Sequence, residues 1–183
     1  DQLGNIITST SISPMLKNAI VATEDKRYYR HFGISPRGIL GAIKTNLQAG
    51  RGPLKGSGGS TITQQTAKLI CLGKKYNPNK WKSERQYEAD CRRTTKTRKI
   101  KEAIFAIIME FRYTKDEILS LYLNRAYLGA GSRGFEAASQ RYFSTPSNKL
   151  NIGQSAMLAG LLKATSTYAP TNNIQKAQTR ANV

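Results

Sequence analysis

Residues 98–111 read Arg-Lys-Ile-Lys-Glu-Ala-Ile-Phe-Ala-Ile-Ile-Met-Glu-Phe, and this stretch decides the fold class. Its large apolar side chains recur at i, i+4, i+7, i+8 and i+11, which is the spacing of one face of an α-helix. These side chains are Ile100, Ile104, Ile107, Ile108 and Phe111. A capping box over 114–117 starts another helix directly afterwards. Because no stretch shows a convincing strand pattern, the sequence predicts a mainly α fold.

Further helix starts are visible before this stretch. Ser13-Pro14 and Ser35-Pro36 each combine an N-cap residue with proline at the first helical position. Five glycines in 50–59 predict a mobile loop, which leads to Ser60 as the N-cap of the next helix. Other helices are expected at about 135–143, at 152–162 and from 172 onward.

Composition limits the class of protein. The chain has 183 residues, with 29 Lys or Arg against 11 Asp or Glu, a formal charge of +18. This length suits one domain, or two lobes that share a core. The charge favours an anionic partner, and nucleic acid, an anionic membrane surface and a phosphorylated substrate all fit. A single histidine makes a structural zinc site improbable. Because the chain lacks an initiator Met and ends within a predicted helix, we expect a piece of a longer protein.

Residues 74–101 concentrate the positive charge. They hold eleven Lys or Arg against three acids, interleaved with Tyr76, Trp81 and Tyr87. We expect an insertion or long loop over 72–97. Cys71 and Cys91 flank it, and a disulfide between them would contribute about 3 kcal/mol in the chain-entropy model. On the cysteine count alone, a disulfide and two free thiols are equally good interpretations.

Two carboxylates are candidates for chemistry. Glu24 ends an apolar helix, where an acid can project into a cleft, although an exposed carboxylate is the simpler interpretation. Glu102 shares one helical face with Arg98 and Lys99, which stabilise its charged form and leave positive charge for a phosphate. A surface salt-bridge ladder explains the same spacing.

The segment 58–68 reads Gly-Gly-Ser-Thr-Ile-Thr-Gln-Gln-Thr-Ala-Lys. Glycines that lead into a helix N-terminus rich in hydroxyls and amides form an anion site through backbone N–H groups and the helix dipole. The Gly-Lys-Ser/Thr order of a Walker loop is absent. Two adjacent glutamines are an unusual choice for a merely solvated face.

Five segments in order resemble the motifs of the peptidoglycan glycosyltransferases (glycosyltransferase family 51). This family occurs in bifunctional penicillin-binding proteins and monofunctional transglycosylases. The segments are 22–33, 59–68, 98–102 continued by 118–124, 127–134 with 137–138 and 142–143, and 156–161 with 168–170. The chain departs from the family at Gln154, where Glu is usual, and at Leu162 and Thr165, where Pro is usual. The stretch between Lys68 and Arg98 is longer than the family pattern.

The resemblance implies a lysozyme-like, two-lobed helical fold with a mobile Gly-rich loop near the cleft, and one glycosyltransferase domain over 1–183. It implies polymerisation of lipid II into glycan strands, with inversion and release of undecaprenyl pyrophosphate. Glu24 would be the base and Glu102 the second catalytic carboxylate. The substrate-binding residues would be Ser60, Thr63, Gln64, Gln65, Lys68, Arg98, Lys99, Asn124 and Tyr127.

The resemblance also implies a setting. The partners would be lipid II, the growing strand and an anionic membrane surface, with divisome or elongation proteins as further candidates and no nucleic acid. No cofactor would be required, although a divalent cation such as Mg²⁺ is allowed. The location would be the extracytoplasmic face of the bacterial cytoplasmic membrane, and in that oxidising setting we expect Cys71 and Cys91 to pair.

Three alternatives remain open from the sequence. A lysozyme-like or lytic enzyme shares the helical fold but needs a protonated acid for its poor leaving group. An inactive relative kept as a scaffold would retain the fold alone. A nucleic-acid-binding module fits the charge but leaves the segment 58–68 unexplained.

Overall fold

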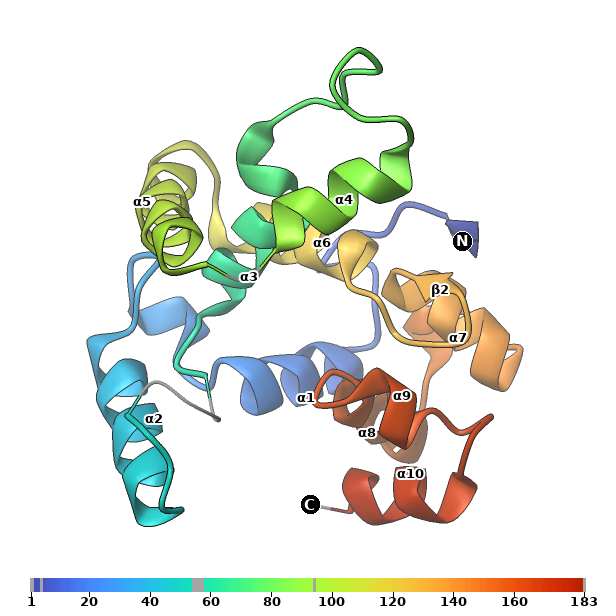
Figure 1. The fold of residues 1–183 in the computed structure, drawn as a ribbon. Coiled ribbons are helices and arrows are strands. Elements are labelled where there is room, and N and C mark those ends of the chain that lie inside the picture. The colour runs from blue at the N-terminus through green and yellow to red at the C-terminus, as the bar shows by residue number, and fades with distance from the viewer. Residues whose placement is uncertain (1, 4, 54–57, 94, 183) are drawn as a thin grey trace. The chain divides into compact units, whose positions relative to one another are not determined.

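The computed structural model describes residues 2–3, 5–53, 58–93 and 95–182, and these form a mainly helical protein (Figure 1). The predicted fold class is therefore confirmed. The helices are α1 (Pro14–Glu24), α2 (Pro36–Gln48), α3 (Ile62–Leu69), α4 (Glu84–Arg92), α5 (Lys96–Arg112), α6 (Lys115–Arg125), α7 (Phe135–Phe143), α8 (Ile152–Leu161), α9 (Thr165–Tyr168) and α10 (Ile174–Ala181). Part of the Gly-rich loop expected over 50–59, namely 54–57, lies outside the described residues.

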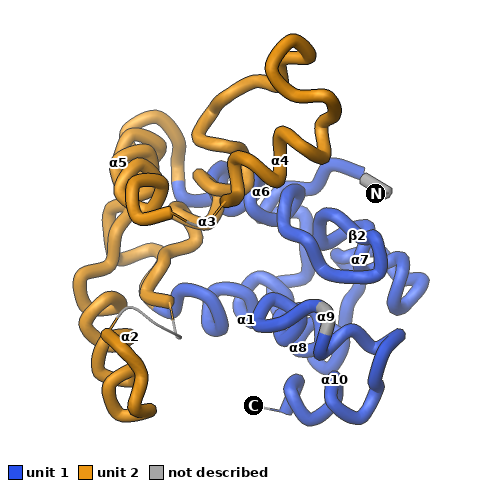
Figure 2. The backbone as a smooth tube through the Cα atoms, in the orientation of Figure 1, with its two compact units in different colours: residues 1–26, 115–183 blue, residues 27–114 orange. Residues whose placement is uncertain are grey.

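The chain divides into two compact units (Figure 2). Unit 1 comprises residues 1–26 and 115–183, and unit 2 comprises residues 27–114. Each unit has its own packed interior. The division agrees with the two lobes that the resemblance implied.

Unit 1 is built around α1 and α8, which pack against each other. Its interior consists of fully buried apolar side chains, among them Leu16, Ile20, Leu123, Phe135 and Leu158. Two very short strands, β1 (Gln2–Leu3) and β2 (Ser132–Arg133), pair in parallel beside it. The sequence did not predict these strands, because two residues are too few to show alternation.

The departure from the family at Gln154 leaves the start of α8 intact. Asn151 is the N-cap, and its Oδ1 accepts from the Gln154 backbone N–H at 2.9 Å. The Asn151 N–H in turn donates to Gln154 Oε1 at 3.1 Å. A glutamine closes this capping box as a glutamate would, because either side chain offers the accepting oxygen.

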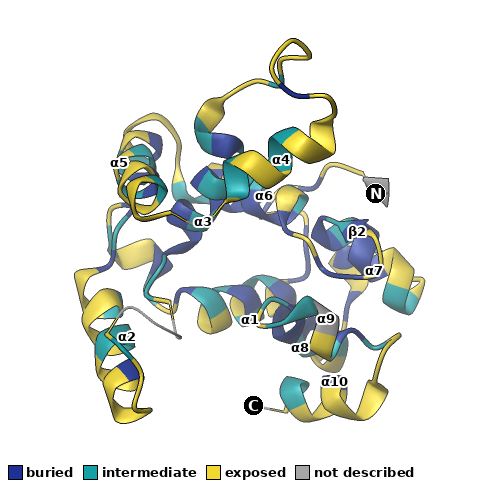
Figure 3. Cartoon of the chain, in the orientation of Figure 1, coloured by how far each residue is buried: buried dark blue, intermediate teal, exposed yellow. Residues whose placement is uncertain are grey.

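Unit 2 is built on the packing of α3 against α5. The periodic stretch forms a helix, α5, as predicted. The residues that α5 buries, however, are Glu102, Ala106 and Met109. The apolar stripe faces outward instead, with Ile100 63% and Phe111 77% exposed (Figure 3). Periodicity identifies a helix and one of its faces; it does not say which face the unit buries.

Two details of unit 2 differ from the sequence predictions. The N-cap of α3 is Thr61 and not Ser60, because Thr61 Oγ1 accepts from the Gln64 N–H at 3.1 Å. The region 72–97, expected as an insertion or long loop, contains all of α4. This helix is too polar to show an apolar period.

Cys71 and Cys91 form a disulfide with their Cα atoms 5.3 Å apart, as expected for an oxidising setting.

Close backbone packing fixes the segment before α2. Gly33 has a φ of +75°, and a Cβ placed on it would lie 2.9 Å from the carbonyl carbon and oxygen of Ala106 on α5. The Gly33 carbonyl accepts a 2.6 Å hydrogen bond from Thr61 Oγ1. This glycine therefore ties together α5, the start of α3 and the segment before α2.

We predict that Gly33→Ala destabilises the protein by more than the ~1–2 kcal/mol of a left-handed alanine, because the Ala106 backbone must also move. Gly41→Ala is the matched control, since Gly41 lies inside α2 and a methyl group there would meet no atom within 4 Å. It should stabilise the protein by about 0.5–1 kcal/mol. Urea unfolding midpoints measure both changes, and equal shifts would contradict the packing described.

Candidate active site

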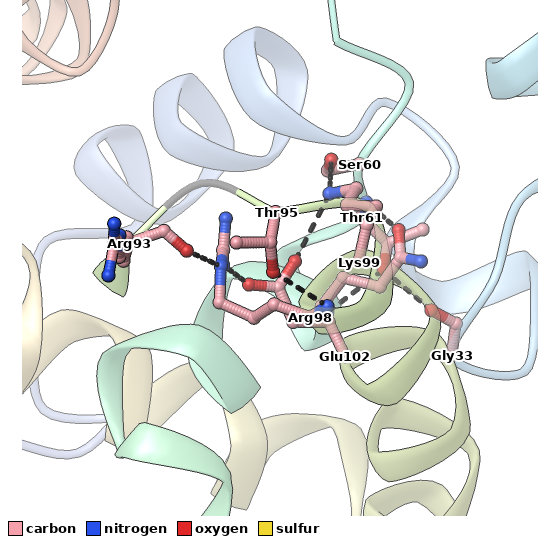
Figure 4. Close-up of polar contacts among 9 residues, drawn as sticks. Gly33, Ser60, Thr61, Arg93, Thr95, Arg98, Lys99 and Glu102 are labelled. Atoms are coloured by element: carbon pink, nitrogen blue, oxygen red, sulfur yellow. Dashed lines mark hydrogen bonds and ion pairs between the residues drawn. The ribbon is translucent and has the colours of Figure 1, made fainter. Parts of the chain in front are cut away.

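A buried carboxylate organises a cluster of cations in unit 2. Glu102 is only 1% exposed. Its Oε1 forms an ion pair with Arg98, and its Oε2 lies 3.3 Å from Lys99 Nζ (Figure 4). The spacings i, i+3 and i+4 on α5 place all three side chains on one face. The site thus holds one negative and two positive groups within one helical turn.

The cluster reaches from α5 to the segment before α3. Lys99 Nζ donates to Ser60 Oγ as well as contacting Glu102 (Figure 4). The Nε–H of Arg98 donates to the carbonyl of Arg93 at 2.6 Å. Thr95, the N-cap of α5, accepts from the Arg98 backbone N–H at 3.1 Å. These contacts fix the direction of both cations.

Lys68, at the end of α3, belongs to the same cluster. Burial first, and then the charges of Arg98 and Arg92, lower the pKa of the Lys68 ammonium. Burial, followed by the charges of Arg98 and Lys68, lowers the pKa of Lys99 in the same way. The positive charges of Lys68, Lys99 and Arg98 therefore act on one another. A bound phosphate would relieve the repulsion.

Arg92 is a member of this cluster that the sequence did not single out. It is the last residue of α4 and follows Cys91, whose disulfide to Cys71 brings the end of α4 back to the end of α3. The disulfide, which the cysteine count left open and which only the family resemblance predicted, brings Arg92 near Lys68. Its Nε is buried and makes no hydrogen bond to a described residue.

The hydroxyls and amides of α3 divide into two groups. Thr63 is fully buried, and its Oγ1 donates to Glu110 Oε1 at 2.6 Å. Gln64 is 5% exposed, and its Oε1 accepts from the Thr61 N–H at 3.0 Å. Ser60 and Gln65 are less buried. Thr63 and Gln64 therefore hold the helix in place, and their direct contact with substrate stays a prediction.

Unit 1 carries the remaining predicted site residues. Glu24 is the last residue of α1 and is half-buried. Burial first, and then the charge of Glu24, raise the pKa of the Tyr122 phenol well above its ordinary value. Tyr122 on α6 is thus a neighbour of Glu24 that sequence reasoning missed.

Asn124 and Tyr127 differ in their contacts and in their exposure to solvent. Asn124 Oδ1 accepts from the Ile7 N–H at 3.0 Å, and its Nδ2 donates to the Ile7 carbonyl at 2.6 Å. The amide thereby holds the N-terminal segment on α6. Tyr127 is 45% exposed and offers its ring to solvent.

Comparison with known proteins identifies the family. The model of a family described as transglycosylase matches residues 1–183. The chain belongs to the transglycosylase family. This match confirms the resemblance drawn from the five motifs.

The transglycosylase relatives include penicillin-binding proteins 1A and 1B. Penicillin-binding protein 1A of Neisseria flavescens is 42% identical over 91% of this chain and 18% of its own length. The 1A protein of Escherichia coli K12 is 40% identical over 97% of this chain and 18% of its own length. Penicillin-binding protein 1B of Haemophilus influenzae is 38% identical over 92% of this chain and 20% of its own length. The chain therefore spans about a fifth of the length of these relatives.

None of the described helices is both long and apolar enough to cross a membrane. Within the described parts of the transglycosylase chain, no three His, Cys, Asp or Glu residues gather as a metal-binding group. The two Glu102 oxygens face Arg98 and Lys99, which favours an anion and not a cation as the ligand.

We predict that pyrophosphate binding weakens as pH rises toward 10, because the lowered pKa values let Lys68 and Lys99 lose their protons earlier than free lysine. The variant Lys68→Arg/Lys99→Arg keeps both charges at these pH values. Isothermal titration calorimetry from pH 7 to 10 should show the wild type weakening relative to this variant. The control Lys149→Arg/Lys163→Arg, at exposed positions, should follow the wild type. Parallel curves for all three proteins would show that the two lysines do not hold the anion.

Proposed function

We propose that this transglycosylase polymerises lipid II, with the growing glycan strand as donor and a lipid II molecule as acceptor. The observation that carries the proposal is the pairing of buried Glu102 with Arg98 and Lys99, with Lys68 near enough to Arg98 for the two charges to interact. In this reaction the acceptor 4-hydroxyl attacks the donor sugar carbon, the bond to the pyrophosphate breaks, and the carbon is inverted. Undecaprenyl pyrophosphate leaves with the bonding electron pair.

The leaving group explains why the site is rich in cations. A pyrophosphate leaves as an anion, so it needs fixed positive charge more than a proton donor. Lys68, Arg98 and Lys99 would hold it as negative charge develops. Donors fixed in this way are each worth roughly 10²–10³ in rate in other enzymes. Ser60 and Gln65 would contact sugar or phosphate oxygens beside them.

The two carboxylates have different roles in the proposal. Glu24 would take the proton of the acceptor hydroxyl as the new bond forms. Glu102 would act on Arg98 and Lys99: it lowers their mutual repulsion and fixes their direction before substrate arrives. Tyr127, being exposed, would contact the acceptor, and Asn124 would support this part of the site through α6. A divalent cation has no step in this scheme.

The same geometry speaks against a glycan-cleaving enzyme. Such an enzyme must protonate a sugar oxygen, and it keeps an acid protonated in apolar surroundings. Glu102 has the opposite surroundings, because two cations stabilise its charged form.

We also propose that unit 2 contacts the membrane in which lipid II lies. On α2, Leu40 is 66% and Leu47 56% exposed, and exposed Arg37 and Lys44 lie on the same helical face. Apolar side chains flanked by cations suit the boundary between acyl chains and anionic headgroups. The apolar stripe of α5 adds to this surface, and Phe111 packs on Phe32 with ring centroids 4.7 Å apart.

The cellular setting follows from these two proposals. Lipid II polymerisation places the protein in the bacterial cell envelope, at the extracytoplasmic face of the cytoplasmic membrane. The Cys71–Cys91 disulfide supports an oxidising compartment. Divisome or elongation proteins are proposed partners there.

We predict that Glu24→Gln folds as the wild type does but forms at least ~10²-fold less glycan, because the hydroxyl loses its base. Glu102→Gln should also lose activity, because Arg98 and Lys99 lose the charge that orders them. Exposed Glu84 provides the matched control Glu84→Gln. The assay is polymerisation of labelled lipid II in detergent, with and without moenomycin, an inhibitor of the family.

The outcomes separate the candidate functions. Moenomycin-sensitive strands that disappear with Glu24→Gln support the proposal. Near-normal polymerisation by Glu24→Gln would reject the role of Glu24. Cleavage of soluble peptidoglycan by the wild type, without polymerisation, would establish the glycan-cleaving alternative.

We predict that Leu40→Ser/Leu47→Ser weakens binding to vesicles with anionic lipid by at least ~tenfold, because two exposed leucines no longer enter the acyl boundary. Ile152→Ser, at a 71% exposed position of unit 1, is the control and should change binding less than about twofold. Vesicle flotation measures both. An equal loss of vesicle binding in the α2 variant and in Ile152→Ser would contradict a membrane-facing α2.

A further inference from the structure

Residues 72–93, here named the stapled segment, form a small folded element of their own. The disulfide joins Cys71, just before the segment, to Cys91 within it. A loop leads out to the start of α4, and α4 returns to the disulfide (Figure 1). Ser83 caps α4, because its Oγ accepts from the Gln86 N–H at 3.2 Å. The segment is therefore held at its base and at the start of its helix.

Aromatic side chains close the interior of the stapled segment. Trp81 is 8% exposed and lies edge-on to Tyr87 at 5.0 Å between ring centroids. Tyr76 packs on Tyr87 at 5.9 Å. Two phenols tie the loop to itself, because Tyr76 donates to the Trp81 carbonyl at 3.1 Å and Tyr87 donates to the Lys74 carbonyl. A merely solvated loop would not bury a tryptophan in this way.

Two of the three acids of the stapled segment serve its internal contacts. Asp90 Oδ2 accepts from the Trp81 indole N–H at 3.2 Å. Glu88 lies 3.5 Å from Arg92 one turn further along α4. The cations, in contrast, are mostly turned to solvent, and the exposed ones are Lys74, Lys75, Lys80, Lys82, Arg85 and Arg93. The outer surface of the segment is accordingly strongly positive.

This surface differs from the proposed membrane-facing surface. Among the described residues between Leu47 and Ile100, no large apolar side chain is exposed. Within unit 2 the loop of the stapled segment also lies at the end away from α2 (Figure 2). A flexible basic tail is sufficient to bind anionic headgroups. The disulfide and the aromatic core hold in place the backbone that carries these cations, which favours a partner segment with closely spaced carboxylates.

We propose that the stapled segment is a docking surface for an acidic, Asp- and Glu-rich segment of a partner protein. The exposed lysines and arginines supply the charge complementarity, and the disulfide and Trp81 core supply a preformed shape. We expect binding to weaken as the ionic strength rises, because salt screens interactions between exposed charges. At physiological salt this screening acts over a Debye length of ~8 Å. This interaction is independent of lipid II polymerisation.

The test uses a twelve-residue oligoglutamate peptide as the probe, at physiological salt. Trp81 is the one tryptophan of the 183-residue chain, so tryptophan fluorescence reports on the stapled segment alone. The variant Lys75→Glu/Lys82→Glu/Arg85→Glu should bind the peptide at least ~tenfold more weakly. Its matched control, Lys149→Glu/Lys163→Glu/Lys176→Glu, changes the net charge equally at exposed positions of unit 1 and should lose less than about threefold. Calorimetry confirms both affinities.

Polymerisation, peptide binding and vesicle binding of the variants can each contradict the proposal. Both triple variants should still polymerise lipid II, which shows that they are folded. Cys71→Ser/Cys91→Ser keeps every charge and should weaken peptide binding, because the array is no longer preformed. Equal losses in the two triple variants would show that net charge alone attracts the peptide and would overturn the proposal. Loss of binding to anionic vesicles, with peptide binding unchanged, would assign the surface to lipid instead.

Discussion

The arrangement of unit 2 depends on one ionic contact, the buried carboxylate of Glu102 between Arg98 and Lys99. A buried charge is tolerated only where it is paired, since the desolvation cost is several kcal/mol per ion. Here the pairing also orders the cations: Lys99 reaches Ser60, and Arg98 reaches the Arg93 carbonyl. The ion pairs that make the burial of Glu102 tolerable therefore also orient the two cations of the site.

Local signals in the sequence were sufficient for most of the helices. Ser35-Pro36 begins α2 as predicted, because the capping hydroxyl and the fixed proline φ act within one turn. The start of α3 was misplaced by one residue because Ser60 and Thr61 both carry a hydroxyl able to cap. The helix α4 was missed, since its nine residues are mostly polar or charged and show no apolar period.

The site was predictable where its residues share a helix and not where they meet through tertiary structure. Helical spacing places Arg98, Lys99 and Glu102 on one face, and the family resemblance identified this face as a candidate site and not a surface salt-bridge ladder. Arg92 reaches Lys68 only through the disulfide, and Tyr122 is a neighbour of Glu24 only through packing within unit 1. Burial of Thr63 depends on Glu110, a residue of another helix. No spacing rule carries information of this kind.

The α5 helix exposes isoleucines and buries a glutamate, and this reversal sets how the two faces can vary through evolution. Glu102, Ala106 and Met109 pack against fixed neighbours, so their volumes and charges are constrained. In the proposed contact with the membrane, the outer face meets fluid acyl chains, which impose no fixed shape on what they touch. On the outer face, Ile100, Ile104 and Phe111 should therefore drift among apolar residues of different shape, with hydrophobicity as the one property retained. We therefore expect the more apolar face of this helix to be the more variable one.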